Sequence, residues 1–398
     1  MAGTLTGLST GQPDVVHVLP DKMGGVHTIC RRLVAQRGPD ALPQRVVLTR
    51  NRWSRDVGAA EPLPVDRCDV VEDCAPAENL YAAWRRLRPL LDGRGALVAN
   101  DLIELAAVAA FPTDRAVFQI LHGDIDYYYD LAARHDADVD VYITYSERMH
   151  RRLRERLPHR ADAILLLRTG VELGASRTPV PGPLRVLFSG RIERDQKGVF
   201  DLPIIDAQLR RRDVQVAWTI QGDGPDLTAL RAAWQNPGVR WTGGRSSRDA
   251  VAELAHHDVY VMPSRWEGLP SALLEACAAG LVPVVSRVSG LDEVVRDGDT
   301  GFCCDVGDTV AFAAAIARLA ASREMVDRVG AAGRDRIAAH WNIATNAARY
   351  QREFARWREW RRPRPAHRTV PYGSRLDRPW LPNTLVRTIR RFTWTRPA

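Results

Sequence analysis

Two glutamates with seven residues between them stand in a segment that reads MPSRWEGLPSALLEA, residues 262–276. Glu267 lies in a predicted loop, and Pro270 fits the first turn of the helix that follows. Glu275 falls inside this otherwise apolar helix, where a carboxylate costs free energy unless it has a partner. Free N–H groups at the helix start, near Leu269, can bind phosphate or sugar oxygens. The pattern favours a polar ligand such as a ribose diol over the alternative of a solvated Glu275.

A second candidate segment, residues 189–198, follows a predicted strand and opens a helix. Backbone N–H groups at such a turn bind anions. Arg191 and Lys197 add two positive charges there, which suits a diphosphate that gains charge as it leaves. The alternative is a surface loop with ordinary cations, and this segment alone does not decide between the two.

A third segment, residues 221–225, reads QGDGP and also follows a predicted strand. Its glycines allow the backbone to approach a ligand closely. Turn chemistry alone explains the same residues, and that reading carries more weight here.

The elements that position these segments alternate between short apolar strands and amphipathic helices. In the first half the predicted strands lie at 15–19, 46–48, 96–98, 116–121 and 139–144. The pattern stops at residues 175–183, which read ASRTPVPGP and suit an exposed linker. It restarts at Leu184, and β-rich runs separated by helices predict parallel sheets covered on both faces.

We therefore expect an α/β fold of two Rossmann-like doubly wound parallel-sheet domains, facing each other across a cleft at the carboxyl ends of their strands. The expected first domain covers residues 1–174 and the second covers 184–341. A C-terminal helix over 342–360 is expected to pack back toward the first domain. A basic, aromatic tail over 361–398 follows, and its end beyond Pro363 is expected to be poorly packed.

Composition limits the class of protein. Hydrophobic residues make up 45% of the 398 residues and charged residues 26%, which is ordinary for a globular chain. The net charge of +8 comes from the tail, where ten arginines stand against one acidic residue, Asp377. A nucleic-acid enzyme usually carries its basic residues along a groove of the body, so no nucleic-acid partner is expected. No apolar run is long enough to span a membrane and the N-terminus lacks signal-peptide features, so a cytoplasmic location is expected.

The second half resembles the retaining glycosyltransferases of family four, which have the GT-B architecture. The resemblance rests on the Pro-Ser-x-x-Glu-Gly-Leu-Pro…Leu-Leu-Glu-Ala pattern, and on the motifs around Gly190, Gly222 and Pro283. It implies that Arg191 and Lys197 hold the donor diphosphate, that Glu275 binds the ribose hydroxyls and that Glu267 contacts the donor sugar. The donor site it implies also includes Gly268, Leu269 and Pro270.

The first half resembles the family more weakly. Gly24 and Gly25 follow the first strand and open a helix, like the family's N-terminal glycine loop near the diphosphate and acceptor. His122 follows a strand end, like the family's histidine near the donor sugar, although a lone histidine is often structural. The usual Pro-Asn-Gly before the linker is replaced by residues 168–170, Arg-Thr-Gly, which puts the hinge contacts in doubt.

Two Asp-x-Asp pairs, at 124–126 and 138–140, mimic the metal-binding motif of a different glycosyltransferase fold. In the family that this chain resembles, cations stabilise the leaving group. We therefore expect no metal ligand set and no cofactor, the nucleotide-sugar being a co-substrate.

The resemblance implies a hexosyltransferase that moves a sugar from a nucleotide-diphosphate-sugar to a glycan, lipid-linked or small-molecule acceptor, with retention at the anomeric carbon. In that reading Arg191, Lys197, His122 and Glu267 form the catalytic set. Two alternatives stay open, a sugar-nucleotide epimerase of the same architecture and a non-catalytic nucleotide-sugar-binding protein.

The tail interleaves arginine with Trp380, Phe392 and Trp394, and residues 385–392 suit a short basic amphipathic helix. Such a helix fits an anionic membrane surface, where each cation contributes ~1 kcal/mol, and would make the protein peripheral at the inner face of the cell membrane. A solvated tail is the equal alternative.

Overall fold

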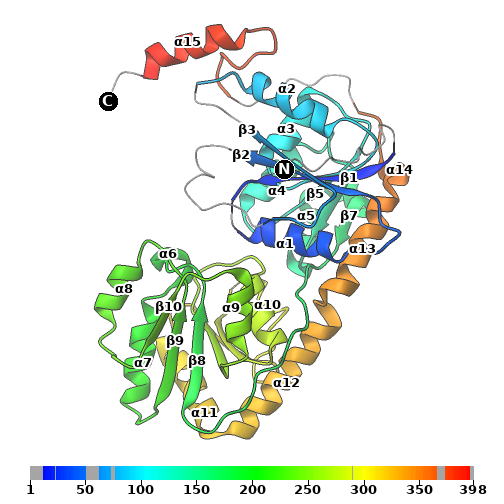
Figure 1. Cartoon of the computed structure of the whole chain (residues 1–398). Coiled ribbons are helices and arrows are strands. Elements are labelled where there is room, and N and C mark those ends of the chain that lie inside the picture. Colours follow the sequence, from blue (N-terminus) through cyan, green and yellow to red (C-terminus); the bar gives the residue numbers. More distant parts are fainter. Residues whose placement is uncertain are drawn as a thin grey trace, which may run out of the picture. The chain divides into compact units, whose positions relative to one another are not determined.

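The computed structural model of the chain (Figure 1) describes residues 12–22, 24–50, 62–72, 77–288, 290–364 and 373–394. The chain divides into two compact units. The first comprises Met1–Tyr145, Met149–Leu167 and Ala347–Ala398, and the second comprises Ser146–Arg148 and Arg168–Asn346.

The first unit contains a parallel sheet of seven strands in the order β3-β2-β1-β4-β5-β6-β7. The strands are β1 (Asp14–Pro20), β2 (Gln44–Arg50), β3 (Arg67–Glu72), β4 (Gly95–Ala99), β5 (Ala116–Ile120), β6 (Val141–Thr144) and β7 (Ile164–Leu166). The strand order reverses between β1 and β4, and ligands of such open sheets bind outside the carboxyl ends of the strands at this reversal.

Helices follow the strands of the first unit and bury their apolar faces against the sheet. They are α1 (Gly25–Ala35), α2 (Leu80–Leu91), α3 (Leu102–Ala110), α4 (Asp126–Arg134), α5 (Glu147–Arg156) and a short 3₁₀ helix, Pro158–Ala163. The main core lies between the sheet and α2 and α3, where Trp84, Leu97 and Leu105 are fully buried.

The second unit contains a parallel sheet of six strands in the order β10-β9-β8-β11-β12-β13. The strands are β8 (Leu184–Ser189), β9 (Val216–Gln221), β10 (Arg240–Gly243), β11 (Val259–Met262), β12 (Val282–Ser286) and β13 (Phe302–Cys304). Here the order reverses between β8 and β11, so the loops after these two strands meet at one edge. These are the loops that carry the two strongest sequence motifs.

The helices of the second unit are α6 (Arg194–Lys197), α7 (Asp201–Arg210), α8 (Leu227–Ala233), α9 (Ser247–Leu254), α10 (Ser271–Ala278), α11 (Thr309–Ala321) and α12 (Arg323–His340). The expected α/β class of two Rossmann-like parallel-sheet domains is confirmed. Helices α11 and α12 are separate, because Ser322 ends α11 and its side chain accepts a hydrogen bond from the Met325 N–H to cap α12.

Residues 175–183, expected as a linker, lie with the second unit in the structure. The guanidinium of Arg177 is 6% exposed and pairs with Asp258 at 3.1 Å. Its Nε also donates to the carbonyl oxygen of Gly280. This segment is therefore fixed to the second unit through a buried arginine.

The C-terminal segment contains α13 (Ile343–Ala355), α14 (Trp357–Trp360) and α15 (Asn383–Trp394). Residues from Ala347 onward group with the first unit, where Tyr350 and Phe354 are fully buried and the Tyr350 hydroxyl donates to the Leu167 carbonyl oxygen. Within the described ranges, no helix has both the length and the apolar character needed to cross a membrane.

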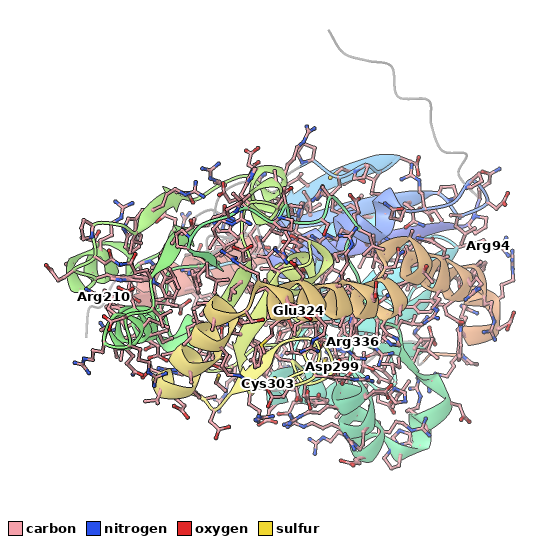
Figure 2. All side chains as sticks on the ribbon, turned by 90° about the horizontal axis from the view of Figure 1, so that it is seen from below. Arg94, Arg210, Asp299, Cys303, Glu324 and Arg336 are labelled. Atoms are coloured by element: carbon pink, nitrogen blue, oxygen red, sulfur yellow. The ribbon has the colours of Figure 1, made fainter. Side chains whose placement is uncertain are left out.

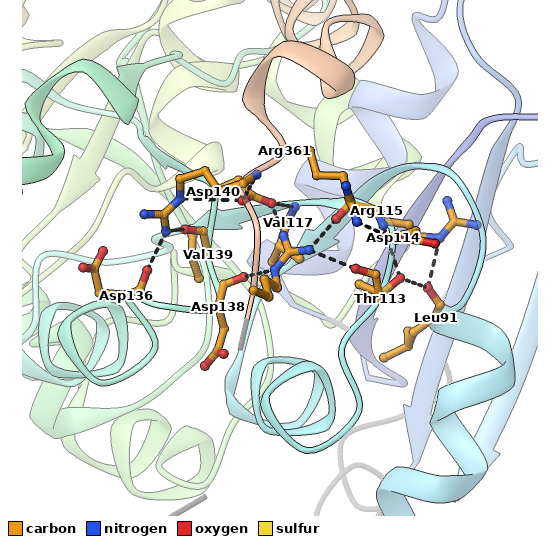
Figure 3. Close-up of polar contacts among 12 residues, drawn as sticks. Leu91, Thr113, Asp114, Arg115, Val117, Asp136, Asp138, Val139, Asp140 and Arg361 are labelled. Atoms are coloured by element: carbon orange, nitrogen blue, oxygen red, sulfur yellow. Dashed lines mark hydrogen bonds and ion pairs between the residues drawn. The ribbon is translucent and has the colours of Figure 1, made fainter. Parts of the chain in front are cut away.

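The expectation of a poorly packed tail beyond Pro363 is wrong at Arg364, whereas most described side chains between residues 373 and 391 are exposed or half-buried. The Asp140 carboxylate, labelled in Figure 3, is 1% exposed and pairs with Arg364, whose side chain is 4% exposed. Arg364 also donates to the backbone carbonyl oxygens of Thr113, Arg115 and Asp138. The arginine that sequence analysis counted as surface charge therefore fills a buried position at the amino-terminal edge of β5 and β6.

Candidate functional site: a charged cluster at the edge of the second sheet

Lys197 closes the short helix α6 and points at a carboxylate from another loop. Its Nζ lies 2.6 Å from Oε1 of Glu267, which follows β11. The Glu267 side chain is 5% exposed and that of Lys197 19% exposed. The Ser264 hydroxyl donates to the same carboxylate oxygen at 2.7 Å. Two motifs seventy residues apart in sequence thus form one partly buried cluster.

The backbone holds these two loops together. Gly198 ends α6 with φ 59°, and a Cβ there would collide with the carbonyl oxygen of Pro263. The Arg265 N–H donates to the Gln196 carbonyl oxygen at 2.7 Å. Arg265 also pairs with Asp201 at 2.6 Å. The backbone on both sides of Lys197 is therefore held in place.

Arg191 lies on the same loop as Lys197 but is more exposed. Its side chain is 58% exposed and Nε lies 3.4 Å from Oε2 of Glu193. An exposed pair of this kind contributes little to stability. The guanidinium can therefore exchange Glu193 for a stronger anion at small cost.

Glu275 lies on α10, and its neighbour across the site is Tyr260 of β11. The negative charges of Glu267 and Glu275 both raise the pKa of the Tyr260 hydroxyl, after burial, which is the larger cause. The Tyr260 hydroxyl donates to the Ser189 carbonyl oxygen at 3.0 Å, at the end of β8. The charges of Glu267 and Glu275 are therefore both felt at Tyr260.

Residues 268–270 lead from Glu267 into α10, which begins at Ser271 with Pro270 at the capping position. Leu269 packs on the buried cluster that contains Leu273 and Leu274. Arg336 of α12 stabilises the loop after β12. Its side chain donates to the carbonyl oxygens of Glu293 and Val294. Figure 2 labels Arg336 and, near it, Asp299 of the same loop.

The glycines of the turn after β9 have a structural explanation. Gly222 has φ 142°, and a Cβ there would collide with the carbonyl oxygen of Gly190. A Cβ at Gly224 would meet the carbonyl oxygen of Ile192 in the same way. The turn is thus packed against the loop that carries Arg191. The close approach that its glycines allow is to a neighbouring backbone.

In the first unit, His122 follows β5 and is held by two partners. Its Nε2 lies 2.7 Å from Oδ1 of Asn100, and its Nδ1 lies 2.8 Å from the Tyr145 hydroxyl. The Asn100 Nδ2 donates to the Val18 carbonyl oxygen, which orients the amide and makes the His122 Nε2–H the donor. Burial lowers the pKa of His122 to about 3. The ring is therefore neutral at physiological pH, and Tyr145 donates to its Nδ1.

Gly24 and Gly25 lie exposed at the start of α1, after β1. A Cβ built on either glycine meets no atom within 4 Å. Packing in the described structure therefore gives no reason for glycine at these two positions, in contrast to Gly198 and Gly222.

The two Asp-x-Asp pairs are engaged by arginines. Asp124 pairs with Arg152 at 3.0 Å and accepts the Tyr129 hydroxyl, and Asp126 pairs with the same arginine. Asp140 pairs with Arg364, as described above. Across the residues that the structure describes, no three His, Cys, Asp or Glu side chains are grouped to hold a metal ion.

The geometry above lies within a segment that matches a known family. The model described as Glycosyl transferases group 1 matches residues 183–322, which include Arg191, Lys197, Glu267 and Glu275. Residues 183–322 belong to the group 1 glycosyl transferases. The glycosyltransferase family that the sequence motifs suggest is thus confirmed for this segment.

Curated relatives cover part of the chain. A glycogen synthase of Mycobacterium tuberculosis (strain ATCC 25618 / H37Rv) is 31% identical over 235 residues, which is 57% of this chain and 56% of that protein. A GDP-mannose-dependent alpha-(1-6)-phosphatidylinositol monomannoside mannosyltransferase of the same strain is 34% identical over 178 residues, 42% of this chain and 46% of that one. The chain thus spans about half the length of these relatives.

Solved structures share the fold over most of the chain. Anabaena HepE, in complex with UDP and glucose, has a TM-score of 0.68 at 14% identity, covering 86% of this chain and 99% of that one. Sucrose-phosphate synthase from Thermosynechococcus elongatus also has a TM-score of 0.68, at 18% identity with the same coverage. At these identities the likeness shows the fold.

Sequence reasoning missed four polar residues that position the candidate side chains: Tyr260 and Ser264 in the second unit, and Asn100 and Tyr145 in the first. Asn100 and Tyr145 each come directly after a buried strand, β4 and β6. The same position at a strand's carboxyl end singled out His122. Applied to every strand, that rule would have found both partners.

Proposed function

We propose that the chain is a retaining hexosyltransferase that uses a nucleotide-diphosphate-sugar as donor. The observation that carries the proposal is the contact between Lys197 and Glu267 within the matched segment. It places an ammonium and a carboxylate, each from a different loop, beside the first turn of α10. A diphosphate and a sugar hydroxyl are the two groups that such a pair would bind from one donor molecule.

In this proposal each residue has a defined role. Lys197 and Arg191 bind the donor diphosphate, and Glu267 accepts hydrogen bonds from the donor sugar, together with the backbone of residues 268–270. Glu275 accepts hydrogen bonds from the ribose hydroxyls. In the first unit, Gly24 and Gly25 leave room for the diphosphate, which agrees with the open space around both glycines.

The reaction that follows is a front-face substitution. The bond between the anomeric carbon and the diphosphate oxygen breaks, and a bond to the acceptor oxygen forms on the same face. The acceptor proton passes to the leaving phosphate oxygen. Lys197 and Arg191 stabilise the charge that develops on this oxygen. Electrostatic stabilisation of this kind is usually the largest single contribution to lowering the activation barrier. The neutral His122 donates or accepts hydrogen bonds and does not carry a proton through the reaction.

We propose further that no metal ion or other cofactor takes part, since the side chains of Arg191 and Lys197 supply the positive charge. The acceptor is a carbohydrate, a lipid-linked glycan or a small molecule. The named activities of the relatives, which include mannosyl transfer and glycogen synthesis, support a hexose donor without defining its base.

Release of nucleoside diphosphate from a panel of nucleotide-sugars tests this proposal. We expect release from one donor class, with or without excess chelator, and loss of release in Glu275→Gln and Lys197→Ala. Arg212→Ala, an exposed arginine at the end of α7, is the matched control and should keep full activity. Formation of an epimerised nucleotide-sugar in place of free diphosphate would instead support the epimerase alternative. Loss of activity in chelator would refute metal independence.

A further inference from the structure

The C-terminal tail carries two structurally different sets of arginines. Between residues 361 and 398 the sequence has ten arginines and one acidic residue, Asp377. Some of these arginines anchor the tail in the first unit. Others make no ion pair within the part of the tail that the structure describes.

Asp377 is the centre of the anchored part around residues 373–394. It is 3% exposed, and its carboxylate accepts from the Leu80 N–H at 2.9 Å and pairs with Arg390 at 2.5 Å. Asn79, fully buried at the start of α2, donates through Nδ2 to the carbonyl oxygens of Arg378 and Leu381. The tail is therefore fixed to the first turn of α2, and Figure 1 shows α15 beside α2.

Helix α15 presents one face to this anchor and another to solvent. Val386 is fully buried and Arg390, one turn later, reaches Asp377. Leu385 and Thr388 are exposed on the opposite side, and Leu385 is 47% exposed. Trp380, in the turn before the helix, is 73% exposed. Among the described residues, no other bulky apolar side chain is exposed to this extent.

Three arginines accompany these apolar side chains: Arg375, Arg378 and Arg387. Arg375 is exposed and the other two are half-buried. No ion pair or side-chain hydrogen bond engages their guanidinium groups among the described residues. We call Arg375, Arg378, Trp380, Leu385 and Arg387 the outer surface of the tail.

We infer that the outer surface of the tail docks on an anionic membrane surface. Exposed tryptophan and leucine side chains beside arginines suit a membrane interface, where tryptophan is enriched at headgroup level and leucine reaches the acyl chains. Each unpaired arginine beside it gains from the negative potential of anionic headgroups. Leu385 favours a bilayer over a nucleic acid, because an aliphatic side chain offers no planar face on which a base stacks, whereas Trp380 suits either partner.

The tail lies near the carboxyl edge of the first sheet. Helix α2 begins at Leu80, after β3 has ended at Glu72, so its first turn lies at the carboxyl edge of the first sheet. Gly24 and His122 follow β1 and β5 at the same edge. A membrane docked on the tail would therefore adjoin the edge of the first sheet that carries Gly24 and His122. The docking itself does not depend on the proposed activity.

Sedimentation of the full chain with vesicles tests the inference. One set of vesicles is phosphatidylcholine, and the other is equal parts phosphatidylcholine and phosphatidylglycerol. We expect binding to the anionic set, with a partition coefficient about a hundredfold lower in R375Q/R378Q/R387Q. W380S/L385S should lower it about tenfold or more. The control R211Q/R212Q/R328Q removes three exposed arginines of the second unit and should bind like wild type.

Point variants are needed because deletion of residues 361–398 would also remove Arg364 and leave the buried Asp140 without it. Unchanged thermal midpoints in the point variants confirm that the tail stays anchored. Equal vesicle binding by wild type and R375Q/R378Q/R387Q would overturn the inference. So would absent binding to anionic vesicles, including the case in which the protein binds a single-stranded oligonucleotide through the same arginines.

Discussion

At the scale of single residues, the pair formed by Lys197 and Glu267 explains why both motifs are needed. The Glu267 side chain is 5% exposed, and its carboxylate accepts hydrogen bonds from Lys197 and Ser264. A buried carboxylate without its cation is costly, so each residue is required for the other's placement. The same ammonium is free to turn toward a diphosphate when a donor sugar takes over Glu267.

Replacement of Lys197 by alanine separates these two roles. We predict that kcat falls by about 10²–10³, because a cation aimed at the leaving oxygen is lost. The thermal midpoint should also fall, because Glu267 is left unpaired. In K197A/E267Q the midpoint recovers, since neither charge remains, but the rate does not. A near-normal kcat in K197A would contradict the role given to the lysine.

Two buried histidines of the first unit predict how stability depends on pH. Burial lowers the pKa of His17 to about 4 and that of His122 to about 3, against 6.5 for an exposed histidine. At these two positions the unfolded chain therefore binds more protons below pH 6.5, and the stability that the two histidines contribute falls as pH drops from 6.5 toward 4. Each histidine contributes a loss of about 2 kcal/mol between pH 7 and pH 5.

Urea unfolding at pH 7 and pH 5 measures this loss. His17→Asn should reduce the difference between the two pH values by about 2 kcal/mol, whatever its effect on stability at pH 7. If the variant loses as much stability as wild type between these pH values, the buried neutral His17 is not responsible for the dependence.

At the scale of elements, the segment after α14 is part of the first unit's structure. Arg364 and Asp140 are both nearly buried, and Asp140 also accepts the Val117 N–H at 2.7 Å and the Arg362 N–H at 2.9 Å. Burial raises the pKa of Asp140, and Arg364 opposes that rise. Arg364→Ala should therefore cost about 3–5 kcal/mol. Arg358→Ala, an exposed arginine on α14, is the control and should cost under about 1 kcal/mol. Equal losses in the two variants would contradict the anchoring role.

The sequence motifs and periodicity predicted most strands, their parallel pairing and the loops that carry chemistry, because buried strands and glycine turns leave local signals. They did not predict β3, β7 and β13, which lie at the edges of the two sheets. The packed tail was not predicted. Arg364 reads as surface charge until Asp140, more than two hundred residues earlier, is known to lie beside it. Gly222 was assigned to turn chemistry or to a ligand, and only the three-dimensional structure shows that it makes room for the Gly190 backbone. Interactions between distant segments have no periodicity in the sequence.

At the scale of the whole molecule, each unit has its own hydrophobic core. The first is built around Trp84 and Leu97 and the second around Phe188 and Trp218. Two cores of this kind unfold as separate cooperative units. We predict two calorimetric transitions, of which a nucleotide-sugar raises the one that belongs to the second unit. A single transition with equal calorimetric and van 't Hoff enthalpies would contradict this prediction.

The central claim is that the second unit binds the donor through the loops after β8 and β11 and through Glu275. A thermal-shift panel of UDP-, GDP-, ADP-, CMP- and dTDP-sugars tests it most directly, with Glu275→Gln beside wild type and Glu324→Ala as the exposed control on α12. A ligand at a hundred times its Kd adds about 2.7 kcal/mol to the stability of the unit that binds it. We predict a midpoint shift of about 5 °C or more for one nucleotide class, kept in Glu324→Ala and lost in Glu275→Gln. No shift with any of the five, or an equal shift in Glu275→Gln, would contradict the account.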